Sequence, residues 1–221
     1  MKTNKIIGGD CLQIMKSIPK NSIDLILTDP PYGDNVAYGT TNKSILNNEN
    51  PLINCLALVE CYRLLKKNKS MYIFTNWKHY PFLTEFIIRY TKFKIRHLII
   101  WKKHNFGLGW AFRHQYEMIL VIEKGKPKYN LKDFSDVQNA SHINHNQQSH
   151  PHEKPIDLIS KMIEHSSKEG DLILDPFCGS GAICKAAMIK NRKFIGIELE
   201  KKWVEMAKNR TKEPIQSFLT Y

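Results

Sequence analysis

The sequence offers little from which to build a disulfide, a zinc site or a membrane span. Its five cysteines are an odd number, and no two of them show the close double spacing of a zinc site. The start, MKTNKIIGGD, has no apolar signal-peptide stretch, and no apolar run approaches the ~18 residues of a membrane span. We therefore expect reduced thiols in a soluble, cytoplasmic protein with no membrane partner.

Positive charge is what the sequence has in excess. Its 221 residues hold 33 Lys and Arg against 21 Asp and Glu, a formal net charge of +12. With 42% hydrophobic and 24% charged residues, the composition is that of a globular chain, long enough for one α/β domain. The charge favours a polyanionic partner, with nucleic acid first, although a merely basic surface is the alternative.

Strand and helix patterns alternate along the chain, with no internal repeat and no long linker. Ile23 to Thr28 is almost continuously apolar, as in a parallel strand covered on both faces. The helix expected over 51–66 is predicted to turn Leu56, Val59, Leu64 and Leu65 inward. Other strands are expected at 4–8, 71–75, 95–101, 118–122, 172–174 and 194–197, and other helices from 11, over 81–90, 155–166 and 181–189, and at the end. This alternation predicts a single α/β domain over 1–221 with a mostly parallel, doubly wound sheet.

The first candidate site, Asp29 to Tyr32, reads DPPY and follows the strand expected over 23–28. Its two successive prolines remove two backbone donors and stiffen the chain, which is more rigidity than a turn requires. The motif therefore indicates a backbone held still for chemistry. The structural alternative for Asp29 is a helix cap or turn acid. For Tyr32 it is a half-buried loop aromatic.

The second candidate site, LILDPFCGSG, reads as a strand, a tight glycine turn and a helix. Gly179 and Gly181 would let the backbone approach a ligand closely. Glu198 ends another strand about 20 residues later, a spacing that suits an acid bound to ribose hydroxyls. The full dinucleotide fingerprint is absent, and Asp175 and Phe177 also differ from it. The sequence thus disfavours NAD and leaves an adenosine-containing cofactor.

Taken together, four motifs resemble the DNA amino-methyltransferases that use S-adenosyl-L-methionine. They are DPPY, HPHEKP from His150, DPFCGSG from Asp175 and IGIELE from Ile195, and GGDCLQIMKSIPKNSIDLILTDPPYG looks like the family's usual amino-terminal block. The catalytic motif precedes the cofactor motif, as in the beta class. Protein glutamine methyltransferases begin their motif with Asn and place it after the glycine loop, so they are disfavoured. The resemblance implies a circularly permuted, Rossmann-like class I methyltransferase fold.

For catalysis, the resemblance implies direct transfer of a methyl group to an exocyclic amine of a flipped base, with no metal. Asp29 and the carbonyl of Pro30 would accept the amino hydrogens, Pro31 would stiffen the turn, and Tyr32 would stack on the base. The Asp first letter favours the 6-amino group of adenine over the 4-amino group of cytosine. Other classes left open are an RNA methyltransferase, a nucleic-acid binding module with a dead site, and an NAD-dependent oxidoreductase.

For the cofactor, the resemblance assigns the glycine loop to the methionine part, Glu198 to the ribose and Asp10 to the adenine. Lys154 would lie near the methionine carboxylate or the pocket entrance, with a surface lysine at a helix start as the alternative. The implied cofactor-binding residues are Asp10, Asp29, Lys154, Pro155, Asp175, Phe177, Gly179, Ser180, Gly181 and Glu198.

Double-stranded DNA is the expected partner, and residues 124–150 are the candidate target-recognition insert, with a solvated loop as the alternative. Asn, Gln and Lys there can read base edges or phosphate. Four histidines invite a metal interpretation, which the missing cysteines disfavour. The insert is short, which suits a short target or help from a second subunit in a homodimer; a cognate restriction endonuclease is a further implied partner. The expected DNA contacts are Lys128, Asn139, Asn144 and Asn146, with Arg113 from the block HNFGLGWAFRHQ.

Overall fold

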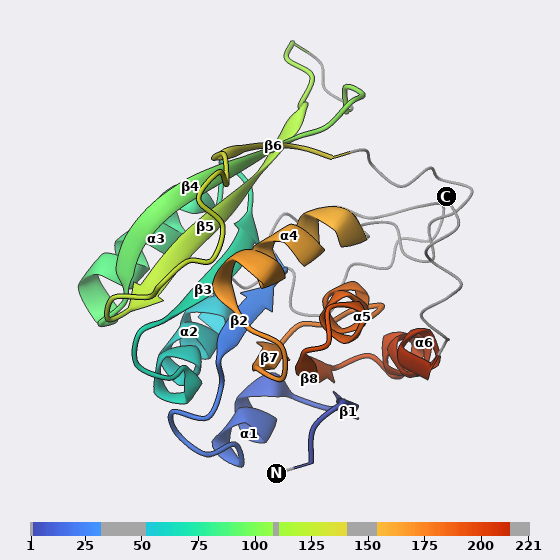
Figure 1. The fold of residues 1–221 in the computed structure, drawn as a ribbon. Helices are drawn as coiled ribbons and strands as arrows, with labels where there is room; N and C mark the ends of the chain where they lie inside the picture. The colour runs from blue at the N-terminus through green and yellow to red at the C-terminus, as the bar shows by residue number, and fades with distance from the viewer. Residues whose placement is uncertain (1, 32–51, 108–110, 141–153, 213–221) are drawn as a thin grey trace.

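The computed structural model describes residues 2–31, 52–107, 111–140 and 154–212, and in these ranges eight strands form one sheet flanked by six helices (Figure 1). The strands are β1 (Lys5–Gly8), β2 (Leu25–Thr28), β3 (Lys69–Thr75), β4 (Lys94–Lys102), β5 (Tyr116–Lys124), β6 (Val137–Asn139), β7 (Leu172–Asp175) and β8 (Lys193–Glu198). The helices are α1 (Cys11–Lys16), α2 (Leu52–Leu64), α3 (Tyr80–Tyr90), α4 (Ile156–Ser166), α5 (Ala182–Ile189) and α6 (Lys201–Lys212). None of these helices combines the length and the apolar character that a membrane span needs.

The sheet has the order β1-β8-β7-β2-β3-β5-β4-β6 and is mostly parallel, as predicted. Among the described strands β5 alone is reversed, because it pairs antiparallel with both β3 and β4. Its beginning therefore lies at the edge where the other strands end. The sequence pattern missed β6, a strand of three residues that is too short to show alternation and that pairs with β4.

Helices cover both faces of the sheet and make two apolar clusters. One cluster packs α4, α5 and α6 against side chains such as Leu25 and Leu27, and the other packs α1, α2 and α3 against side chains such as Ile26. The alternation along β2 thus fills both clusters, which explains its continuous apolar run.

Helix α2 turns a different face inward from the predicted one. Leu64 and Leu65 are buried, but Leu56 and Val59 are 46% and 48% exposed. The helix is apolar on most of its surface, so periodicity could not select the inward face. Smaller side chains, Ala57 and Cys61 with Leu58, pack there instead.

The connections reverse direction between β7 and β2. From β7 the chain passes through α5 to β8, whereas from β2 it passes through α2 to β3, on the opposite side. Crevices outside the carboxyl ends of strands at such a switch point are the usual ligand sites of α/β sheets. Asp29 and Asp175 stand at this point.

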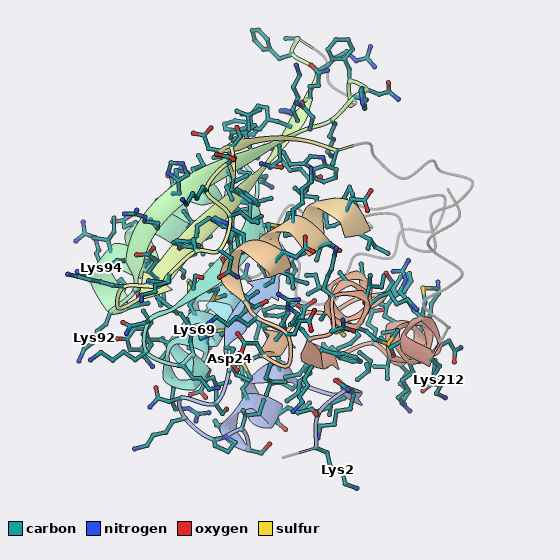
Figure 2. All side chains as sticks on the ribbon, viewed as in Figure 1. Lys2, Asp24, Lys69, Lys92, Lys94 and Lys212 are labelled. Carbon is teal, nitrogen blue, oxygen red and sulfur yellow. The ribbon has the colours of Figure 1, made fainter. Side chains whose placement is uncertain are left out.

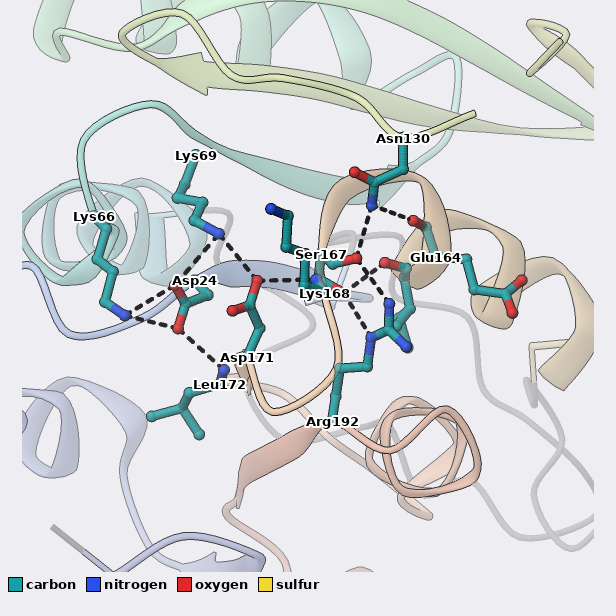
Figure 3. Close-up of polar contacts among 11 residues, drawn as sticks. Asp24, Lys66, Lys69, Asn130, Glu164, Ser167, Lys168, Asp171, Leu172 and Arg192 are labelled. Atoms are coloured by element: carbon teal, nitrogen blue, oxygen red, sulfur yellow. Dashed lines mark hydrogen bonds and ion pairs between the residues drawn. The ribbon is translucent and has the colours of Figure 1, made fainter. Parts of the chain in front are cut away.

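The segment from Gly125 to Ala140 is packed on the body of the domain. The ring of His165 lies between Tyr129 and Phe134, with centroid distances of 4.7 and 4.5 Å. Asn130 donates from Nδ2 to the carbonyl oxygens of Glu164 and Ser167 at 2.7 and 2.8 Å (Figure 3). These contacts fix this part of the segment to the end of α4, which lies at the amino edge of the sheet.

Candidate active site

Asp29 and Lys154, distant in the sequence, meet at the switch point. Asp29 follows β2, and its Oδ2 lies 2.7 Å from Nζ of Lys154, which precedes α4. Lys154 is only 6% exposed, so the alternative of a surface lysine is wrong. A contact of Lys154 with the methionine carboxylate stays a prediction, while the described contact is with the candidate catalytic acid.

Glu117, which the sequence analysis missed, holds Lys154 from a second direction. Its Oε2 lies 3.2 Å from Lys154 Nζ, and its Oε1 lies 2.6 Å from Lys103 Nζ. Burial alone would raise the pKa of Glu117, but the charges of Lys154 and Lys103 outweigh it and lower that pKa to about 2. Burial alone would lower the pKa of Lys154, but Asp29 and then Glu117 raise it above its ordinary value. The four side chains form a row of alternating charge.

A second missed residue, Asn54 of α2, holds the turn after Asp29. Its Nδ2 donates to the carbonyl oxygen of Pro31 at 2.7 Å, and the side chain is 3% exposed. Pro30 and Phe177 border one small apolar cavity together with Asn54, which brings the two motifs side by side. Tyr32 lies outside the described residues, and its stacking role stays a prediction.

Asp175 ties the two strands of the switch point together. Its Oδ1 accepts hydrogen bonds from Thr28 Oγ1 at 2.9 Å and from the backbone N–H of Phe177 at 3.1 Å. The side chain is 1% exposed, and burial, reinforced by the charges of Asp29 and Glu198, raises the pKa of Asp175 to about 8. The described contacts are those of a brace, and a cofactor contact stays a prediction.

The glycine loop uses its two glycines for different purposes. Both have positive φ, +47° at Gly179 and +84° at Gly181, where a side chain is strained. A Cβ at Gly179 would meet no atom within 4 Å, so a ligand can approach that backbone. A Cβ at Gly181 would lie 2.9 Å from that of Ala207, so this glycine permits close packing of α6. In the same loop, Ser180 Oγ lies 2.9 Å from Arg210 Nη1.

Glu198 and Asp10 lie next to each other at the same edge. Glu198 accepts from the N–H of Gly179 at 2.9 Å, and its carbonyl accepts from the N–H of Gly9 at 2.8 Å. Burial is the largest cause that raises the pKa of Glu198. Asp10 caps α1 by accepting from the N–H of Gln13 at 3.0 Å. Contacts of these acids with ribose and adenine stay predictions, as does any role of Pro155, which precedes α4.

The donor set fits the cofactor that the motifs imply. Asp29 and Glu198 place acidic groups at one edge of a chain whose net charge is +12. S-adenosylmethionine carries a sulfonium and an ammonium, which such carboxylates attract. The open space at Gly179 would admit it against the backbone. In the described ranges, no group of three or more His, Cys, Asp or Glu side chains is arranged to hold a metal ion.

The predicted DNA contacts lie at both edges of the sheet. Lys128 lies at the amino edge, away from Asp29, because Lys126 donates from its backbone to Asn68 and Asn130 bonds to the end of α4. Asn139 ends β6 and Arg113 lies between β4 and β5, so both are at the carboxyl edge of the sheet, the edge at which the site lies. Asn144 and Asn146 lie outside the described residues, as do the four histidines His142, His145, His150 and His152.

Comparison with known proteins agrees with this geometry. The family model described as DNA methylase matches residues 23–209. The type II methyltransferase M.HpaI of Haemophilus parainfluenzae is 31% identical, over 97% of this chain and 76% of its own length. The DNA adenine methyltransferase YhdJ of Escherichia coli K12 is also 31% identical, over 93% of this chain and 81% of its own.

Solved structures share the fold. The M1.HpyAVI–SAM complex superposes with a TM-score of 0.75 at 24% identity, covering 95% of this chain and 99% of that one. The cytosine-N4-specific PvuII DNA methyltransferase gives a TM-score of 0.79 at 17% identity, covering 96% and 88%. The chain belongs to the DNA methylase family, the S-adenosylmethionine-dependent amino-methyltransferases of DNA.

Proposed function

We propose that this protein methylates the 6-amino group of adenine in double-stranded DNA, within a restriction-modification system. The observation that carries the proposal is the Asp29 carboxylate at the switch point, held by Lys154 at 2.7 Å on a turn stiffened by Pro30 and Pro31. A relative 31% identical to this chain is named a DNA adenine methyltransferase.

The chain's own residues would act by positioning. S-adenosylmethionine supplies a methyl group on a positively charged sulfur. The Asp29 carboxylate and the Pro30 carbonyl accept the two amino hydrogens, which localises the nitrogen lone pair for in-line attack. Lys154, 2.7 Å from Asp29 Oδ2, holds the Asp29 carboxylate in place. Tyr32 stacks on the base after it leaves the duplex, since the amine cannot be reached inside the stack.

The 4-amino group of cytosine is the second candidate substrate. It offers the same local chemistry, and the cytosine-N4-specific PvuII enzyme shares the fold at a TM-score of 0.79. The Asp first letter of the motif favours adenine over this candidate.

Contact with duplex DNA would come from the β4–β5 arm, residues 103–107 and 111–115. This arm extends beyond the rest of the sheet (Figure 1). It exposes Phe106 and Phe112 by 59% and 86%, and the guanidinium of Arg113 lies 5.5 Å from the Phe106 ring centroid. Exposed aromatics beside an arginine suit stacking on bases and contact with phosphate.

The excess positive charge would act more generally. Lys92 and Lys94 project from the same side of the molecule, and Lys2 and Lys212 project from other parts of the surface (Figure 2). Positive charge at several places attracts DNA without defining one contact surface. A second subunit and a cognate restriction endonuclease complete the partners we propose.

The test uses tritiated S-adenosylmethionine, unmethylated genomic DNA and an Asp29→Ala variant. After digestion to nucleosides, we expect label in N6-methyladenine nucleoside with the wild type and almost none with the variant. Label only on cytosine would overturn the adenine assignment. Unlabelled DNA, with label in an RNA substrate instead, would overturn DNA as the substrate.

A further inference from the structure

We propose that Glu117 is a positioning residue for methyl transfer, which holds the Lys154 ammonium in the direction that Asp29 needs. The proposal rests on the proposed function, because it takes Asp29 as the hydrogen-bond acceptor for the target amine. It concerns a residue of β5, outside the motifs that carry the family resemblance.

The geometry shows why Asp29 alone does not fix the direction of the Lys154 ammonium. A lysine has a flexible four-carbon stem and a compact charge, so one carboxylate fixes the distance of its nitrogen but not its direction. The Asp29 and Glu117 contacts, at 2.7 and 3.2 Å, come from β2 and β5. The ring of Phe74 on β3 lies 5.4 Å from the same nitrogen. Three strands therefore define its position.

The reversal of β5 makes this arrangement possible. Glu117 is the second residue of β5, and β5 begins at the edge where β2 ends. A strand in the parallel direction would present its second residue at the opposite edge, far from Asp29. The antiparallel strand thus supplies a carboxylate from within the sheet, where Glu117 pairs with Trp101 of β4 and the next residue, Met118, pairs with Thr75 of β3.

Lys103 completes the balance of charge. With its Nζ 2.6 Å from Glu117 and 5.1 Å from the centre of the Trp101 ring, it compensates the second carboxylate. Without it, two partly buried acids would share one ammonium. Lys103, Glu117, Lys154 and Asp29 carry two positive and two negative formal charges, so the cluster is balanced.

The primary test is Glu117→Gln, which keeps the shape of the side chain and removes its charge. We expect kcat to fall by about 10- to 100-fold, as expected for a misplaced catalytic group, with the cofactor Kd changed less than about threefold. A purely structural role would instead change stability and cofactor binding together with kcat. Glu117→Asp, which keeps the charge, should recover part of the activity.

The matched control is Glu123→Gln on the same strand. Glu123 is buried, at 8% exposed, whereas the Glu117 side chain is 20% exposed; it lies at the other end of β5 and accepts from Tyr129 Oη at 2.8 Å. This variant should lose stability while keeping wild-type kcat. If Glu117→Gln fails to fold, Lys103→Met serves in its place. We expect the same loss of kcat and a smaller change in the cofactor Kd than in Glu117→Gln.

Wild-type kcat in Glu117→Gln would overturn the inference while leaving the proposed function intact. Equal losses in Glu117→Gln and Glu123→Gln would also overturn it, since they would indicate general destabilisation. Failure of the wild type to label DNA at all would instead count against the proposed function.

Discussion

Strands β2 and β7 carry acids at both of their ends, and the two edges treat those acids in opposite ways. At the amino edge, both oxygens of Asp24 lie 2.8 Å from Lys66 Nζ, and one of them accepts from the N–H of Leu172 (Figure 3). Lys69 lies 3.3 Å from Asp24 and bridges to Asp171. Burial alone would raise the pKa of Asp24, but these partners outweigh it and lower that pKa.

At the carboxyl edge, Asp29 contacts Lys154, but Asp175 of β7 and Glu198 of the neighbouring strand β8 have raised pKa values, with burial as the largest cause. The described donors to these two acids are the Thr28 hydroxyl and backbone N–H groups. Lysine contacts at the amino edge hold the loops that start the strands. The comparison therefore separates an acid whose pKa is lowered by nearby lysines from acids whose pKa is raised by burial.

Exchanging one acid for its amide at each edge should produce the largest contrast. Asp29→Asn should reduce kcat by about 10²- to 10³-fold, because a charged acceptor aimed at the reacting amine is lost. Asp24→Asn should reduce the free energy of unfolding by about 1–3 kcal/mol, a range lowered by the partial exposure of Lys66, and leave kcat near wild type at low temperature. Methylation rates and urea titrations on both variants measure the contrast. An Asp24→Asn enzyme that is fully folded but inactive would break it.

The pH dependence of stability should have opposite signs at the two edges. In the folded state the pKa of Asp175 is raised to about 8, whereas an ordinary Asp has a pKa near 3.8. The folded state thus binds more protons in this window, so its stability contribution falls as pH rises from about 4 to about 8. Asp24 has a lowered pKa, so its contribution is present above the ordinary Asp range and is lost as pH falls below it.

Asp175→Asn should therefore flatten the decline of unfolding free energy between pH 5 and pH 8. Asp24→Asn should change only the acid side. Urea unfolding at several pH values measures both slopes, with the wild type as reference. A wild-type stability that rises steadily from pH 5 to pH 8, unchanged by Asp175→Asn, would contradict the assignment.

The sequence predicted the parts of the site that are local. DPPY after a strand and a glycine turn before a helix are visible in a few residues, and the alternation of strands and helices puts their ends at one edge. What it could not reveal depends on long-range arrangement. Glu117 is a lone acid in an apolar strand, and its position at the site depends on the reversal of β5.

The same reversal explains why Lys128 lies at the amino edge, away from Asp29, since β5 ends there. Its contact with DNA stays a prediction. Asn54 sits on a helix whose inward face was itself mispredicted, so its contact with Pro31 had no local signal. The candidate site residues within a motif can be predicted from the sequence. The residues that hold the motif in place come from elsewhere in the fold, so they are found only from contacts in the structure.

Asn54 gives the smallest expected effect but the clearest separation between a residue that stabilises the fold and one that supports activity. Its Oδ1 is buried and has no hydrogen-bond partner among the residues that the structure describes, while Nδ2 holds the Pro31 carbonyl. An unpaired buried oxygen costs about 1–3 kcal/mol, so this asparagine is a poor choice for stability alone. Asn54→Leu keeps the branched shape, adds volume beside the small cavity that Asn54 borders, and removes both the unpaired oxygen and the hydrogen bond. We expect unfolding free energy within about 1 kcal/mol of wild type and a loss of roughly tenfold in kcat, as the turn after Asp29 loosens.

Cys61→Ala, on the same buried face of α2, is the control, because it removes packing without touching Pro31 and should cost stability with little change in kcat. If Asn54→Leu lost stability and kept its activity, Asn54 would belong with Asp24 among the residues that serve the fold.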